Sequence, residues 1–277
     1  MSNCSNSACS GCSNHSDKKK EFFEPYNKLS NIKKVISVMS GKGGVGKSFI
    51  TSTLAVSLAK KGYKVGILDA DITGPSIPKV FGIDEKAKAC SDGTFPIETK
   101  KLGIKIMSIN LLLDDKETPV VWRGPMIGGA VKQFWQEVIW GDIDILLIDM
   151  PPGTGDVPLT VFQTIKLDGA IIVTAPQDLV SLIVKKSYNM AQKMDINILG
   201  IIENMSYIEC DNCNNIIYPF GKSNIEEMAF DMKIDLLSKI PLIPENTAFC
   251  DKGKIESIEI ENINNVSETI LNKISLK

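Results

Sequence analysis

The segment from Gly41 to Ser48 reads GKGGVGKS and matches the phosphate-binding pattern G-x-x-x-x-G-K-[ST]. A strand is predicted before it and a helix after it, which argues against a chance glycine-rich turn. Glycines let the backbone curl so that its N–H groups face phosphate oxygens, and the helix N-terminus adds a favourable partial charge. We expect Lys47 to hold the β- and γ-phosphates of ATP and Ser48 to bind Mg²⁺. The residues expected to line this nucleotide site are Gly41, Lys42, Gly43, Gly44, Val45, Gly46, Lys47, Ser48 and Phe49.

Two carboxylates at the ends of predicted strands extend this interpretation. Asp71 follows the strand predicted at Lys64–Leu68, where it is placed to orient the attacking water or to contact Mg²⁺. Asp149 follows an apolar run, as a carboxylate that meets Mg²⁺, usually through water, should. The glycines after Asp149 suit a loop that moves when the γ-phosphate leaves. In this order the three elements predict ATP hydrolysis, with Lys47 and Asp71 in catalytic roles.

A further set of reactive side chains is the thiol pair Cys210 and Cys213, spaced C-x-x-C. Such a pair occurs as a redox dithiol, a zinc site or an iron–sulfur site. The redox alternative is the least favoured, because the residues from Asp211 to Asn215 indicate a turn rather than a helix N-terminus. Zinc and iron–sulfur sites both prefer four thiolates, and Cys90 and Cys250 are isolated. A second copy of the chain, related by a two-fold axis, is the simplest source of the missing pair.

Continuous apolar runs, separated by helical patterns, must position these residues. This alternation is typical of a predominantly parallel sheet with helices on both faces, and therefore of an α/β fold of the P-loop NTPase kind. The predicted strands are Val35–Met39, Lys64–Leu68, Ile104–Ile109, Ile143–Ile148, Ala170–Thr174 and Ile198–Ile202, and the predicted helices are Ser48–Lys61, Met126–Ile139 and Leu179–Met194.

The first residues differ in composition from the rest of the chain. Residues 1–17 are dominated by Ser, Asn, Gly and Cys, which predicts a disordered tail. Charged residues follow, and order is expected to begin near Ile32. We therefore expect residues 1–31 to form a cysteine-containing tail with a charged lead-in, and residues 32–277 to form one P-loop ATPase domain that carries the thiol pair.

Charge and hydropathy argue against several other classes of protein. The chain is 43% hydrophobic and 23% charged, as in an ordinary globular protein, and its formal net charge of −2 provides no basic field for nucleic acid. Because no apolar run reaches about 18 residues, no membrane-spanning helix is expected. The N-terminus lacks the apolar stretch of a secretory signal, which favours the cytoplasm, where cysteines stay reduced.

Lys42 is not required by an ordinary phosphate loop and, taken alone, is best explained as a solvated loop lysine. However, GKGGVGKS resembles the deviant phosphate loop of the dimeric ATPases that include MinD, ParA and the nitrogenase iron protein. In that class the early lysine reaches the nucleotide of the partner chain. The resemblance therefore implies that Lys42 is catalytic and acts in trans in a homodimer.

A closer resemblance covers about residues 32–255. The sequence WRGPMIGGAVKQFWQEVIWGDIDILLIDMPPGTGDVPLT at 122–160, with DADITGPSIP before it and ENMSYIECDNC after it, resembles the Mrp/ApbC family of iron–sulfur cluster carrier ATPases. This resemblance implies a labile [4Fe–4S] cluster bridged between two protomers by Cys210 and Cys213, its delivery to recipient apoproteins, and slow ATP hydrolysis tied to that transfer. It also implies that Asn204 lies near the adenine and that Pro241 lies in a second adenine-side loop.

The N-terminal cysteines depart from the pattern of the relatives. Cys4, Cys9 and Cys12 resemble the cysteine-rich extension of the Nbp-type relatives, which carry four cysteines there, whereas this tail has three and His15. A second metal site and a tail with no specific role both fit.

Two other functions stay open. A ParA/MinD-type positioning ATPase would use a basic amphipathic C-terminal helix on lipid. Residues 263–277 carry an apolar stripe but only two lysines, which favours a helix docked on the sheet. A zinc-stapled ATPase dimer is the second alternative, because zinc accepts the same thiolates as an iron–sulfur cluster.

Overall fold

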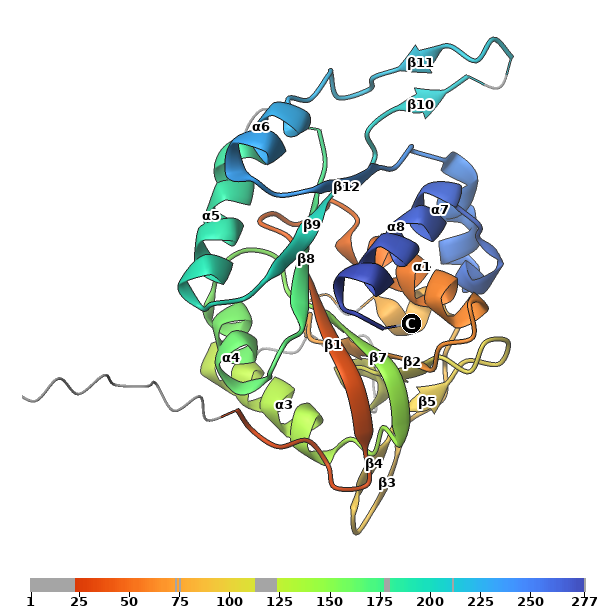
Figure 1. Cartoon of the computed structure of the whole chain (residues 1–277). Helices are drawn as coiled ribbons and strands as arrows, with labels where there is room; N and C mark the ends of the chain where they lie inside the picture. Colours follow the sequence, from red (N-terminus) through yellow and green to blue (C-terminus); the bar gives the residue numbers. More distant parts are fainter. Residues whose placement is uncertain are drawn as a thin grey trace, which may run out of the picture.

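The computed structural model of the chain describes residues 23–72, 74, 76–112, 124–176, 180–210 and 212–276. Within these residues, eight strands form one sheet in the order β12-β9-β8-β1-β7-β2-β6-β5 (Figure 1). Neighbouring strands are parallel, except that β5 runs antiparallel to β6 at one edge. The strands are β1 (Asn31–Met39), β2 (Val65–Asp69), β5 (Ile97–Glu98), β6 (Lys105–Met107), β7 (Asp142–Asp149), β8 (Gly169–Thr174), β9 (Ile198–Glu203) and β12 (Leu236–Lys239).

Helices cover both faces of this sheet, which confirms the predicted fold class (Figure 1). One face packs against α3 (Gly124–Glu137), α4 (Asp156–Thr164), α5 (Val180–Lys193) and α6 (Ile225–Met232). The other packs against α1 (Lys47–Lys60), α2 (Ile77–Val80) and α8 (Glu261–Lys273). On this second side, α7 (Pro244–Asp251) contacts α2 and the 3₁₀ turn η2 (Ile255–Ser257).

Residues of the central strands alternate between two hydrophobic cores. In β1, Val35 and Met39 belong to the core under α3–α6, whereas Ile36 and Val38 belong to the core under α1 and α8. All four side chains are buried. A strand covered on both faces needs apolar residues at successive positions, which is why these strands appear in the sequence as unbroken apolar runs.

Several short elements have no signal in the sequence. Two hairpins are formed by β3 (Lys88–Cys90) with β4 (Gly93–Phe95) and by β10 (Ile208–Glu209) with β11 (Ile216–Ile217). The strand predicted at Ile104–Ile109 ends at Met107 and gives way to the 3₁₀ turn η1 (Ile109–Leu111). Strands this short contain too few residues to show the alternation that identifies a strand.

The segment before β1 differs from the expectation that order begins near Ile32. Glu24 accepts hydrogen bonds from Lys132 Nζ and Gln136 Nε2 of α3, at 2.6 and 2.9 Å. The rings of Tyr26 and Trp135 pack edge to face, with their centroids 5.4 Å apart. These contacts attach the charged lead-in to the domain. The tail expected at residues 1–17 lies outside the described residues, so the boundary at residue 31 stays a prediction.

The C-terminal helix α8 docks on the domain, as predicted. It packs against α1 and β12. Its apolar stripe of Ile263, Val266 and Ile270 is buried, and Ile274 just beyond it is also buried. Among the residues that the structure describes, no helix combines the length and the apolar character needed to cross a membrane.

Candidate functional site

The phosphate loop joins the end of β1 to the start of α1. Gly44 and Gly46 have φ angles of 81° and 80°, in the left-handed region that favours glycine. At Gly46 space is limiting as well, because a Cβ atom would lie 2.2 Å from Nδ2 of Asn204. That Nδ2 donates a hydrogen bond to the carbonyl oxygen of Val45 at 3.0 Å. The predicted adenine-side residue Asn204 is therefore held directly against the loop.

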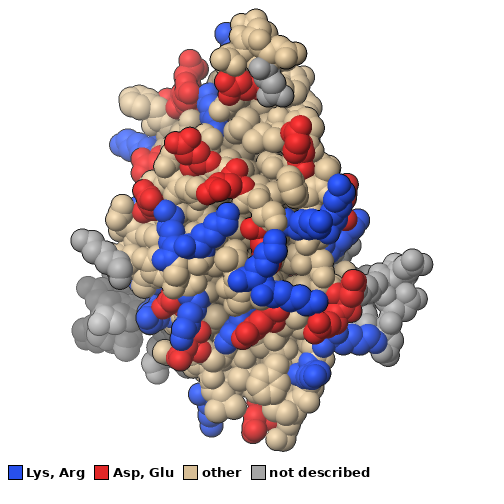
Figure 2. All heavy atoms as spheres, turned by 90° about the vertical axis from the view of Figure 1, so that its right-hand side faces the viewer, with Lys and Arg blue, Asp and Glu red and all other residues tan. Residues whose placement is uncertain are grey.

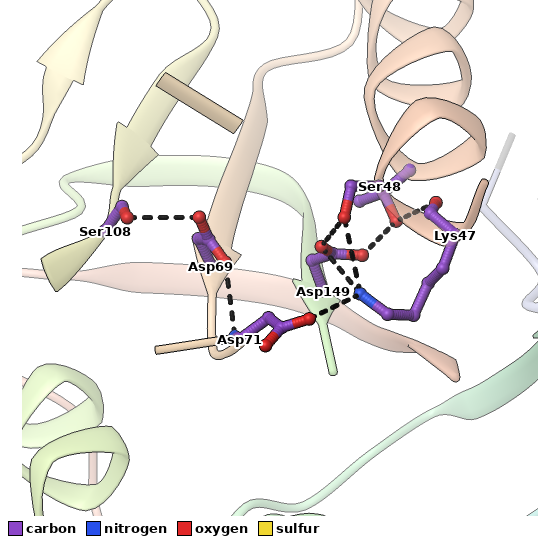
Figure 3. A network of polar contacts seen from close by, with 7 residues as sticks. Lys47, Ser48, Asp69, Asp71, Ser108 and Asp149 are labelled. Atoms are coloured by element: carbon purple, nitrogen blue, oxygen red, sulfur yellow. Dashed lines mark hydrogen bonds and ion pairs between the residues drawn. The ribbon is translucent and has the colours of Figure 1, made fainter. Parts of the chain in front are cut away.

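Lys47 occupies the centre of a polar network at the start of α1 (Figure 3). Its side chain is buried, and Nζ lies 2.8 Å from Oδ2 of Asp149 and 3.8 Å from Oδ2 of Asp71. Nζ also lies 3.4 Å from Oγ of Ser48. The structure thus brings together the four residues from which we predicted phosphate and Mg²⁺ contacts.

Asp149, the last residue of β7, is fully buried, and both of its carboxylate oxygens are occupied. Oδ2 accepts a hydrogen bond from Ser48 Oγ at 2.6 Å and the ion pair from Lys47. Oδ1 lies 2.7 Å from Oγ1 of Thr51, one turn further along α1. The sequence analysis did not single out Thr51, because a threonine within a helix carries no signal of a distant partner.

Asp71 lies just beyond the end of β2 and is positioned by Asp69. The backbone N–H of Asp71 donates to Asp69 Oδ1 at 3.2 Å, and Ser108 Oγ donates to Asp69 Oδ2 at 3.0 Å (Figure 3). Burial, and then the negative charge of Asp149, raise the pKa of Asp69 to about 8. Asp69 therefore acts as a structural group beneath the site, and Asp71 is the more exposed of the two carboxyl groups.

A cavity of about 400 Å³ opens above this network. Every residue predicted to contact nucleotide lines it, except Gly41, which packs against Ile183. Asn204 and Pro241 form part of the wall, and their contact with an adenine stays a prediction. Lys42 lies at the cavity with its side chain exposed to solvent.

One side of the cavity comes from residues that the sequence analysis did not connect with the site. Asn246, Thr247 and Cys250 of α7 line it, together with Met205. Burial is the main cause that raises the pKa of the Cys250 thiol. No motif marks these residues, although Pro244 at the first turn of α7 is a recognisable helix start.

The thiol pair occupies the turn of the β10–β11 hairpin. The backbone N–H groups of Cys213 and Asn214 both donate to the carbonyl oxygen of Cys210, at 3.3 and 2.7 Å. Asn214 has a φ angle of 55°, which closes the turn. Cys213 is exposed and Cys210 half-buried, and neither is in a disulfide. In the part of the chain that the structure describes, no group of three His, Cys, Asp or Glu side chains could hold a metal ion.

The nucleotide cavity and the thiol hairpin share one hydrogen-bonded segment. Beyond β9, the N–H of Ser206 donates to Ile240 O at 2.9 Å, and the N–H of Leu242 donates to Tyr207 O at 2.7 Å. Just before Ser206, Met205 has a φ of 55°, unusual for a residue other than glycine. The chain that forms a cavity wall at Asn204 therefore continues directly into β10.

A phosphate loop that leads into a helix, with a buried lysine, a serine hydroxyl and a strand-end carboxylate around it, defines a P-loop nucleotide-binding protein. The family model described as the NUBPL iron-transfer P-loop NTPase matches residues 31–275. The chain belongs to this family.

Individual relatives agree with this assignment. An iron-sulfur cluster carrier protein of Clostridium perfringens is 49% identical over 240 residues, which cover 84% of each chain. A nucleotide-binding protein of Archaeoglobus fulgidus, solved in complex with ADP, is 45% identical with a TM-score of 0.75, covering 83% of this chain and 90% of that one. The septum site-determining protein MinD of Pyrococcus horikoshii, at 23% identity and a TM-score of 0.60 over 86% of this chain and 96% of that one, shows the fold alone.

Proposed function

We propose that this protein binds ATP with Mg²⁺, hydrolyses it slowly, and carries a labile [4Fe–4S] cluster, held between two copies of the chain, to recipient apoproteins. The observation that carries the proposal is a phosphate-loop cavity whose wall at Asn204 and Met205 continues directly into the hairpin that carries an incomplete thiol site. The family and the relative named as an iron-sulfur cluster carrier support it. We also propose that the protein works in the cytoplasm, where its thiols stay reduced.

The residues at the phosphate loop fit a magnesium ion. Ser48 Oγ and Asp149 Oδ2 lie 2.6 Å apart, and Asp71 reaches the same Lys47 ammonium. A hydroxyl and two carboxylates are the oxygen donors that Mg²⁺ prefers. We assign Ser48 as a direct ligand, with Asp71 and Asp149 acting beside it. When bound, Mg²⁺ would neutralise charge on the phosphate oxygens.

The ammonium of Lys47 can pair either with Asp149 or with the phosphates of a bound nucleotide. Without nucleotide its ammonium is paired with Asp149 at 2.8 Å. Triphosphate oxygens offer more negative charge, so we propose that Lys47 turns to the β- and γ-phosphates. Asp149 then keeps the hydrogen bonds from Ser48 and Thr51. Asp71 orients the attacking water.

Two observations, one on Lys42 and one on the C-x-x-C turn, support the homodimer. Lys42 lines the cavity and is exposed to solvent, as a lysine that contacts a partner's nucleotide would be. The C-x-x-C turn supplies only two of the four thiolates that a [4Fe–4S] cluster takes. Since β1 and β9 are parallel strands of one sheet, the phosphate loop and the root of the thiol hairpin both leave the sheet at the carboxyl ends of its strands. One two-fold axis beyond that end can therefore relate both parts to their copies in a second chain.

The two alternatives receive less support. A positioning ATPase has no use for the thiol pair, and the C-terminal helix that it would place on lipid has its apolar stripe buried against α1 and β12. A zinc-stapled dimer would use the same thiolates and differs only in the metal. The test must therefore identify the metal directly.

The decisive measurement is iron, sulfide and zinc per dimer after expression and purification without oxygen. Cys4, Cys9 and Cys12 are replaced by Ser in the full chain, so that the N-terminal thiols cannot contribute. About four irons and four sulfides per dimer are expected, in keeping with a bridging cluster. They should be lost in Cys210→Ala and kept in the matched control Cys90→Ala. Zinc without sulfide, or four irons per monomer, would contradict the proposal.

A further inference from the structure

Glu203, the last residue of β9, carries a buried carboxyl group that takes no part in the proposed nucleotide or thiol chemistry. It is 1% exposed, and its Oε2 accepts a hydrogen bond from Ser206 Oγ at 2.6 Å. Among the residues that the structure describes, its Oε1 has no hydrogen-bond partner. Burying a carboxyl group with an oxygen unpaired costs free energy. Stability therefore does not explain this group, and a role is to be sought in its contact with Ser206.

The contact between Glu203 and Ser206 closes a turn that lies against the nucleotide cavity. The two residues between them, Asn204 and Met205, both line the cavity. Asn204 is hydrogen-bonded to the phosphate loop, and Met205 has a φ of 55°. A methionine keeps this left-handed conformation only where its surroundings hold it there. The side-chain hydrogen bond across the turn provides such a restraint.

The same turn determines where the thiol hairpin begins. β10 starts two residues after Ser206, and Cys210 lies four residues after it. The hairpin projects from the body of the molecule (Figure 1), and the upper end where it lies is mainly uncharged (Figure 2). Glu209 is the one charged residue that the structure describes in this hairpin, so ion pairs can contribute little to its position. That position depends instead on hydrogen bonds at the root, those of Ser206 and the one from Leu242 N–H to Tyr207 O.

We propose that Glu203 and Ser206 are positioning residues that couple nucleotide occupancy of the cavity to the position of the thiol hairpin. The inference rests on the proposed function, since it concerns the regulation of the same two sites. A nucleotide that contacts Asn204 and Met205 restrains one side of the turn, and the side-chain hydrogen bond passes this restraint to Ser206 on the other side. By linkage, occupancy of the thiols then changes nucleotide affinity by the same factor.

Four substitutions separate coupling from stability. Glu203→Met keeps the length of the side chain but removes the acceptor, and because it also removes a poorly paired buried carboxyl group, it should unfold at no lower temperature than wild type. Ser206→Ala removes the donor. Glu203→Gln is the first control, since its carbonyl oxygen can accept the same hydrogen bond. Ser57→Ala is the second control, because Ser57 is also buried and donates at 2.6 Å, to Asn264 Oδ1, away from the cavity.

The experiment is hydrogen–deuterium exchange of the full chain with and without saturating ADP, followed by mass spectrometry of peptides that cover residues 206–217. None of these residues lines the cavity among those that the structure describes. In wild type, ADP should slow exchange of this segment about tenfold, because a hydrogen bond to a carboxylate changes an opening equilibrium by at least that factor. Both controls should keep this ADP effect, whereas Glu203→Met and Ser206→Ala should reduce it to about one.

A purely structural contact would give a different result. Exchange in Ser206→Ala would then rise by the same factor with and without ADP, and the ADP effect would keep its wild-type size. That outcome, absence of the ADP effect in wild type, or its loss in either control would each overturn this inference alone. If Ser206→Ala does not fold, Glu203→Met decides by the same ratio. A wild-type chain that fails to bind ADP would overturn the proposed function as well.

Discussion

Replacing Thr51 by Val tests whether the α1 threonine holds Asp149 in place. Valine has nearly the same shape as threonine but no hydroxyl. The substitution therefore removes the 2.7 Å contact with Asp149 Oδ1 without opening a cavity. Thr51 and Asp149 are both fully buried, so water cannot replace the lost hydroxyl donor. A hydrogen bond to a charged group contributes about 1.5–3 kcal/mol to stability. For a domain of about 250 residues, 1 kcal/mol shifts the melting temperature by about 2 °C, so that loss lowers it by about 3–6 °C.

The assay is thermal unfolding, with Thr53→Val as the matched control. Thr53 lies on the same helix, is also buried, and donates only to helix carbonyls, those of Phe49 and Ile50. Thr51→Ser keeps the hydroxyl and should recover most of the stability. A second readout is the Mg²⁺ concentration needed to tighten ADP binding, which should rise about tenfold in Thr51→Val, because a carboxylate beside the ion loses its support. Equal melting temperatures for Thr51→Val and Thr53→Val would refute the assignment.

Three further predictions concern the cavity. Lys47→Ala should abolish nucleotide binding, measured by calorimetry, and should lower stability by about 3 kcal/mol because Asp149 stays buried without its cation; full ADP affinity would contradict the phosphate-loop assignment. Lys42→Ala should bind ATP and hydrolyse it poorly. When it is mixed with Asp71→Asn chains, ATPase activity should return, because each heterodimer holds one site with an intact Asp71 and a partner's Lys42. Demonstrated heterodimers without ATPase activity would count against action in trans. Alkylation of Cys250, followed by mass spectrometry, should keep accelerating above pH 9.0, because the thiolate reacts and burial raises the pKa of this thiol from that value. ADP should slow that reaction, since Cys250 lines the cavity, and an unchanged rate would contradict this geometry.

Features that depend on local sequence could be predicted. The phosphate loop is one short segment, and its glycines, lysine and serine act through backbone geometry that the spacing alone determines. The central strands were recognisable because burial on both faces requires apolar residues throughout. The position of Asp149 at the end of such a strand follows from the same pattern.

Features that depend on distant contacts could not be predicted. The partners Thr51 and Asp149 are separated by 98 residues, and nothing near either one indicates the other. Glu24 attaches the lead-in to α3 through side chains more than a hundred residues away. The two faces of the thiol hairpin depend on a register between strands of two residues each, which is too short to produce a pattern.

The hydrogen bond between Leu242 and Tyr207 also limits how the sequence can change in evolution. It fixes the root of the hairpin to the cavity wall, so the chain from Tyr207 to Cys210 acts as a spacer of set length. Since side chains alternate along a strand, inserting one residue there would turn the thiols to the opposite face. Inserting two would restore the face but displace the thiols by about 7 Å. Substitutions within this spacer are therefore far easier to accommodate than changes in its length.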